Sequence, residues 1–163
     1  MRLATHEQQN HLLIWIKRLV MPYEELGGNR VCPYAHLAKM RAVNVQIRDL
    51  KELPDIKCDV LILICSEQKL SHNNPLTHNE LKEHCARLAE QYPDMIFLPD
   101  SEKETHINGV QTNNGKYKLI LCQNKQKLLG ARTQLAKTDY YTFWEPEYLK
   151  EIVGDSLDLM GST

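Results

Sequence analysis

Six consecutive apolar residues near the middle of the chain constrain its fold more than any other feature. The run Val60 to Cys65 is apolar on both faces of an extended segment, which is typical of a strand at the centre of a sheet. Residues 43–48 instead alternate apolar and polar side chains, as a strand with one wet face does. The linker between the two runs has the length of an irregular connection rather than a helical crossover, so we expect these strands to pair antiparallel.

Local signals for helix starts surround these strands. Thr5 with Gln8, and Thr77 with Glu80, have the spacing of capping boxes, in which two side chains satisfy free amides at a helix start. Asn124 is placed to cap a further helix. Together with the apolar periodicity, these signals predict helices over residues 5–21, 78–92, 124–137 and 146–153, and strands over 95–98 and 117–122.

The resulting order of elements favours an α+β fold in one domain over residues 1–163. Its middle section, αββαββ, has the order of a permuted ferredoxin-like sandwich, a four-stranded, largely antiparallel sheet with helices packed on one face. A thioredoxin-like α/β fold is the alternative, because Cys32-Pro33-Tyr34-Ala35 is similar to the Cys-Pro-Tyr-Cys of glutaredoxins with Ala35 in place of the second cysteine. Such folds place a buried strand before the motif, and residues 24–31 form a poor strand.

Charge and cysteine content narrow the class of protein. The 20 basic and 21 acidic residues nearly balance, so we expect no nucleic-acid partner. The longest apolar run is too short to cross a bilayer, and the first residues lack the apolar core of a signal peptide, so no membrane association is expected. Five cysteines without a CxxC pair indicate reduced thiols. These observations predict a cytoplasmic protein.

Cys32 is the strongest candidate for chemistry. Pro33 suits the first position of a helix, which makes Cys32 the expected N-cap of a helix that ends near Ala42. Free amides and the positive end of the helix dipole favour a thiolate there, and Arg30 adds to that effect. His36 lies one helical turn further on and can serve as the base. We therefore expect Cys32, His36 and Arg30 to be catalytic.

The segment over residues 99–115 is the second candidate region. It is too long for a hairpin turn, and long connections of this kind are often functional. Asn-Gly pairs at 108/109 and 114/115 predict that part of it folds as a small hairpin. We expect His106, Asn108 and Gln111 to bind a substrate, and the acidic run over 100–104 to be a solvated loop.

Two parts of the chain resemble a group of small bacterial and phage proteins of unassigned function. The resemblance is carried by the helix with Trp15, the loop after it and Cys32-Pro33-Tyr34-Ala35, which are similar to a tryptophan-bearing helix followed by a Cys-Pro-Phe/Tyr-Ala motif. It covers about residues 10–40, and residues 128–144 look like the C-terminal part of some of these proteins. At His36 the chain differs from the group, which often has lysine there. The resemblance implies a recurring protein type and no particular activity.

Three hypotheses for function follow. The leading one is a small thiol-dependent protein of open substrate, with Cys32 as nucleophile or redox centre; whether it is an enzyme stays open. The first alternative is a non-catalytic protein that binds a small molecule or a protein through the 99–115 segment. The second is a metal-dependent enzyme with Cys32, His36 and His106 as ligands. The chain has no phosphate-binding or dinucleotide-binding motif, so no cofactor is expected.

Overall fold

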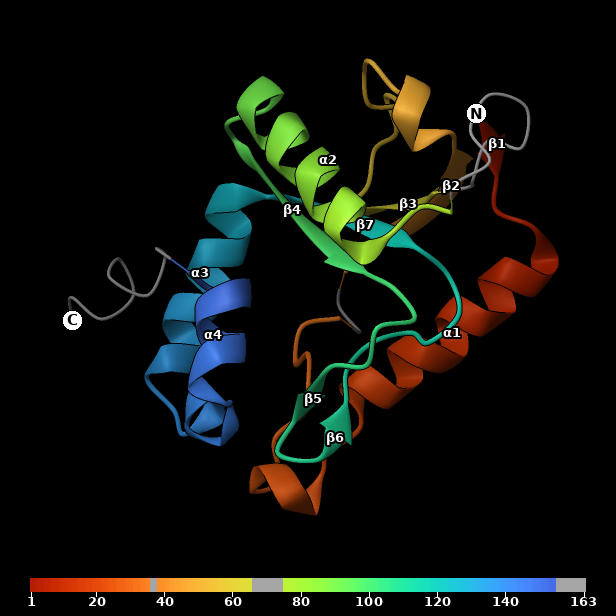
Figure 1. The fold of residues 1–163 in the computed structure, drawn as a ribbon. Coiled ribbons are helices and arrows are strands. Elements are labelled where there is room, and N and C mark those ends of the chain that lie inside the picture. The colour runs from red at the N-terminus through yellow and green to blue at the C-terminus, as the bar shows by residue number, and fades with distance from the viewer. Residues whose placement is uncertain (36–37, 66–74, 155–163) are drawn as a thin grey trace.

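Five strands form one mixed sheet in the computed structural model of the protein, which describes residues 1–35, 38–65 and 75–154 (Figure 1). Only β2 and β3 are parallel, and every other neighbouring pair is antiparallel. The expected α+β class is therefore confirmed, and β3 lies at the centre as predicted. In spatial order the strands are β1 (Arg2–Leu3), β2 (Met40–Val45), β3 (Val60–Cys65), β7 (Leu119–Asn124) and β4 (Met95–Asp100).

The direction of β2 corrects the predicted antiparallel pairing with β3. Met40 lies opposite Val60 and Val45 opposite Cys65, so the two strands run the same way. Residues 46–59 are long enough to return along the sheet, which a parallel connection requires. They contain the short 3-10 helix η2 (Ile47–Asp49), and Leu50, among others, packs against the core. Apolar packing thus stabilises a crossover that contains no α-helix.

The predicted helix from Pro33 to Ala42 is wrong. Residues 32–35 form a turn, and the chain enters β2 at Met40. This stretch contains good helix formers, but all six residues of β2 pair with β3 instead. Tertiary structure here overrides local helix propensity. The strand expected over 43–48 correspondingly begins and ends earlier.

The other predicted helices form close to their expected positions. The capping box is present at the first helix, where the Thr5 and Gln8 side chains each accept a backbone N–H of the other residue. Thr77 likewise accepts the Glu80 N–H at 3.1 Å. The helices are α1 (His6–Val20), α2 (His78–Gln91), α3 (Lys125–Ala136) and α4 (Pro146–Ile152), with short 3-10 helices η1 (Glu24–Leu26) and η3 (Tyr140–Phe143).

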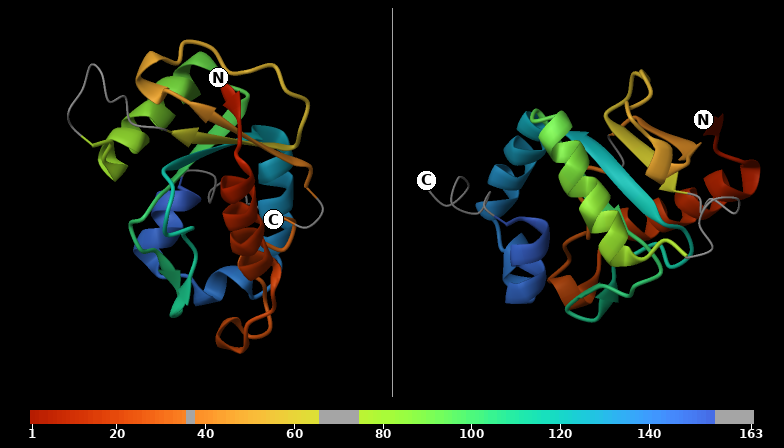
Figure 2. Two further views of the ribbon diagram at one scale, coloured as in Figure 1. Left: turned by 90° about the vertical axis from the view of Figure 1, so that its right-hand side faces the viewer. Right: turned by 45° about the horizontal axis from the view of Figure 1, so that its top comes forward.

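Helices cover both faces of the sheet, which corrects the expectation of helices on one face. Figure 2 shows α2 on one side and α1 on the other. Leu81 and Leu88 of α2 pack in a core cluster with alternate β3 residues such as Leu63, whereas Trp15 of α1 packs with Ile62. The strand that is apolar on both faces thus buries both faces. The helices on both faces of the sheet and the direction of β2 differ from the expected ferredoxin-like arrangement.

The thioredoxin-like alternative is not confirmed. Residues 22–31 contain η1 and an isolated bridge between Pro22 and Arg30, with no strand of the main sheet directly before Cys32. The small hairpin predicted within 99–115 is confirmed as β5 (His106–Ile107) and β6 (Val110–Gln111). Among the described residues, no helix has the length and apolar character needed to cross a membrane.

Candidate functional site

Cys32 lies in a turn instead of at a helix start. Its backbone N–H donates to the Leu19 carbonyl at 2.8 Å, and its carbonyl accepts the Ala35 N–H at 3.2 Å. The residue is half-buried. The helix dipole on which the sequence argument relied therefore does not act on this thiol.

The surroundings of Cys32 favour the neutral thiol. Burial raises its pKa above 9.0, although the backbone N–H groups of Ala35 and Tyr34 and the charge of Arg132 act in the opposite direction. A thiol with a raised pKa is mostly protonated at neutral pH, and the protonated form is a poor nucleophile. Arg30 is exposed, and its predicted effect on the thiolate stays a prediction. His36 lies outside the described residues, so its role as a base stays a prediction.

Arg132 is a buried cation whose charge acts on Cys32, and the sequence analysis does not single it out. Its side chain is 7% exposed, and Nη2 donates to the Ile152 carbonyl at 3.3 Å. Burial lowers its pKa, while Tyr141, Tyr140 and Cys32 oppose that effect. Within the described ranges Arg132 makes no ion pair. One feature of the sequence could have indicated Arg132, namely a charged residue on the apolar side of the helix α3.

The three predicted substrate-binding residues all lie in the hairpin of β5 and β6, and their role in binding stays a prediction. His106 is exposed and lies opposite Gln111 in the hairpin. Asn108 is in the hairpin turn, where its N–H donates to the Glu145 carboxylate at 3.2 Å and its Nδ2 to the Glu25 carbonyl at 2.7 Å. Asn108 thus joins three segments of the chain, a structural role.

The hairpin nevertheless packs against the segment that carries Cys32. Ile107 and Val110 belong to a small apolar cluster with Val31 and Leu26. This contact brings the 99–115 segment close to Cys32 through apolar side chains. No hydrogen bond among the described residues joins His106 to Cys32.

A cavity of about 250 Å³ lies between the start of α2, the end of β4, the following segment and α4. Its apolar lining includes Cys85, Phe97 and Ile152, from three different elements. Five lining residues, numbered 99–101, 103 and 105, come from the predicted functional segment. Apolar walls with a few polar groups are typical of small-molecule sites.

His78 is the first residue of α2, and Thr77 before it is the N-cap of this helix. Its Nδ1 lies 2.8 Å from the hydroxyl of Ser101, which is 2% exposed and also accepts the Lys103 N–H at 3.1 Å. Burial lowers the pKa of His78, with further lowering by the charges of Lys103 and Lys82. His78 is therefore mostly neutral at pH 7.

Asp100 ends β4 and lines the same cavity, half-buried rather than on a solvated loop as expected. Its Oδ2 accepts hydrogen bonds from the backbone N and the Nδ2 of Asn114, at 2.8 and 2.5 Å. Burial raises the pKa of Asp100 to about 6, against the effects of these bonds and of the Arg18 charge. Such perturbed carboxylates concentrate at functional sites.

Three further charged residues line the cavity, namely Lys82, Lys103 and Glu151. Lys82 Nζ lies 2.6 Å from Glu151 Oε1, so an ion pair joins α2 and α4. Lys103 is exposed, and its charge reaches both His78 and Glu151. The cavity is thus lined by groups of both signs.

A buried polar network holds the 99–115 segment in place. Thr112 is 7% exposed, and its carbonyl accepts the Trp15 Nε1–H at 2.9 Å. Its hydroxyl lies 2.5 Å from that of Thr105 and 3.0 Å from that of Tyr148 in α4. Satisfied networks of this kind make a segment rigid. The wall of the cavity is therefore preformed.

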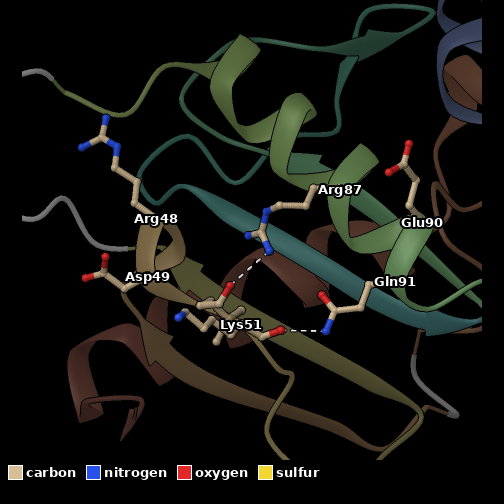
Figure 3. A pocket seen from close by; sticks show the side chains of 7 residues that line it. Arg48, Asp49, Lys51, Arg87, Glu90 and Gln91 are labelled. Carbon is tan, nitrogen blue, oxygen red and sulfur yellow. Dashed lines mark hydrogen bonds between the residues drawn. The ribbon is translucent and has the colours of Figure 1, made fainter.

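An open groove between α2 and residues 48–51 is larger but has a structural explanation. Figure 3 shows Arg87 and Gln91 reaching from α2 to the opposite backbone. Arg87 donates to the Leu50 carbonyl at 3.1 Å, and Gln91 to that of Lys51 at 2.7 Å. These side chains hold the crossover between β2 and β3, so we assign no ligand to the groove.

No group of three or more His, Cys, Asp or Glu residues in the described part of the chain is arranged to hold a metal ion. The proposed ligand set of Cys32, His36 and His106 includes one residue outside that part. Comparison of the chain with protein-family models, curated proteins and solved structures finds no match. The resemblance over residues 10–40 therefore stays a prediction.

Proposed function

We propose that the protein binds a small molecule in the cavity between α2, β4 and α4, with the 99–115 segment as one wall. This develops the binding alternative from the sequence and locates the site at the base of the segment instead of at its hairpin. The observation that carries it is the presence of Asp100 and His78, both with perturbed pKa values, in one cavity with apolar walls.

A cavity-filling variant tests the proposal. Ile152→Trp adds volume at a lining residue while leaving its carbonyl for Arg132. We expect a library of small polar molecules to contain members that raise the thermal midpoint of the wild type, because binding to the folded state stabilises it. These shifts should vanish in Ile152→Trp. Lys150→Trp, exposed on the same helix and outside the cavity, is the matched control and should keep them. Shifts that persist in Ile152→Trp contradict the proposal.

A thiol function at Cys32 is the second candidate, and the buried Arg132 favours it. A guanidinium without an ion pair among the described residues can stabilise the thiolate once it forms. We expect Arg132→Gln to move the pH profile of Cys32 alkylation by iodoacetamide to higher pH. Arg30→Gln should leave the profile unchanged. Alkylation is measured by mass spectrometry of the native proteins. A profile that moves in Arg30→Gln and stays unchanged in Arg132→Gln excludes this role for Arg132.

A further inference from the structure

This inference rests on the proposed function, in which the cavity is a binding site. The charged residues that line the cavity indicate the class of ligand. Lys82 and Glu151 form an ion pair at 2.6 Å and largely neutralise each other. The remaining charged groups of the lining are Asp100 and Lys103, one of each sign. Neither takes part in an ion pair among the described residues.

Asp100 has one carboxylate oxygen left for a ligand. Oδ2 accepts both hydrogen bonds from Asn114, whereas Oδ1 accepts none within the described ranges. Arg18 on α1 lies near enough for its charge to act on Asp100, but no ion pair forms between them. A half-buried carboxylate gains most from a charged donor, because a charge-assisted hydrogen bond is about twice as strong as a neutral one.

Lys103 supplies a positive charge to the lining of the cavity. Its backbone N–H is fixed on Ser101 at 3.1 Å, and its side chain is exposed. The cavity also offers apolar contact with Phe97, Leu98 and Ile152. At about 250 Å³ it is smaller than the 300–1,000 Å³ typical of drug-sized ligands.

We propose that the cavity binds a small zwitterion, an α-amino acid with an apolar side chain. Its ammonium donates to Asp100, its carboxylate lies at Lys103 and its side chain contacts the apolar wall. A simple carboxylic acid leaves the Asp100 charge unpaired, which is costly for a half-buried group. A simple amine leaves only Lys103 without a partner, and an exposed ammonium remains hydrated at little cost.

Three matched probes test this assignment by isothermal titration calorimetry. Leucine carries both charges, 3-methylbutylamine lacks the carboxylate and 4-methylpentanoate lacks the ammonium. We expect leucine to bind a few-fold tighter than the amine and at least tenfold tighter than the acid. Asp100→Asn keeps an oxygen for Asn114 and should weaken leucine at least tenfold, whereas Lys103→Gln should weaken it up to about fivefold, as for an exposed pair. Lys116→Gln, on an exposed lysine away from the cavity, is the control.

The outcomes separate this inference from the proposed function. Equal binding of 4-methylpentanoate and leucine, or unchanged leucine affinity in Asp100→Asn, overturns the zwitterion assignment. The zwitterion assignment also fails if leucine does not bind while other library members do, and Ile152→Trp abolishes their binding. In that case the cavity remains a binding site. If no molecule binds the cavity, both proposals fail.

Discussion

At the scale of single residues, the ionised Asp100 side chain lowers the stability of the folded protein and is also the group that we propose binds the ligand. Its carboxylate is held half-buried by Asn114, and its burial disfavours the ionised form. Residues that destabilise a fold while lining a cavity are expected at functional sites rather than in passive structure. The sequence analysis assigned Asp100 to a solvated acidic run, because nothing in the neighbouring residues shows that the end of β4 lines a cavity with residues of α4.

The pH dependence of stability tests this description of Asp100. Its pKa is about 6 in the folded protein against an ordinary 3.8, so ionisation favours the unfolded chain. The destabilisation is fully present above about pH 6, declines as the pH falls from 6 to 4, and is absent below about pH 4, where both states are protonated. We expect Asp100→Asn to be more stable than wild type by roughly 1–3 kcal/mol at pH 7.5 in urea unfolding, with the difference shrinking below pH 6. A difference that does not change between pH 4 and 7.5 contradicts the assigned pKa.

At the scale of elements, the two capping-box pairs predicted helix starts correctly, whereas the helix start at Pro33 and the direction of β2 were predicted wrongly. Thr5 with Gln8 and Thr77 with Glu80 specify helix starts through contacts three residues apart, and both starts form. The direction of β2 and the loss of the helix after Pro33 depend instead on pairing with β3, which no short window of sequence contains. The site was missed for the same reason: His78, Asp100 and Tyr148 come together only through the fold.

The hydrogen bonds by which Arg87 of α2 holds the crossover between β2 and β3, which we call the clamp, give a prediction at this scale. Arg87 donates to the carbonyls of Leu50 and Ile47, at 3.1 and 3.4 Å. Arg87→Met keeps much of the aliphatic packing and removes these donors, so we expect a loss of about 1–3 kcal/mol in urea unfolding. Glu90→Gln, exposed in the same groove, should change stability by less than about 0.5 kcal/mol. An undiminished stability in Arg87→Met shows that the clamp does not hold the crossover.

At the scale of the whole molecule, the sheet separates two regions with different roles. On one face α2 closes the larger apolar core, and on the other α1 packs against the sheet and, through Trp15, against the 99–115 segment (Figure 2). The cavity forms where α2, the end of β4 and α4 meet. We therefore propose that binding is a property of the assembled fold and not of the Cys32 motif alone.

The location of a bound ligand tests this account most directly. We would record ¹H–¹⁵N spectra of the protein during titration with a molecule that raises its thermal midpoint. The account predicts that the largest shift changes fall on amides of residues 78–82, 97–105 and 148–152, which surround the cavity. Changes concentrated instead at residues 32–35, or in the open groove at residues 48–51 and 87–91, would contradict it.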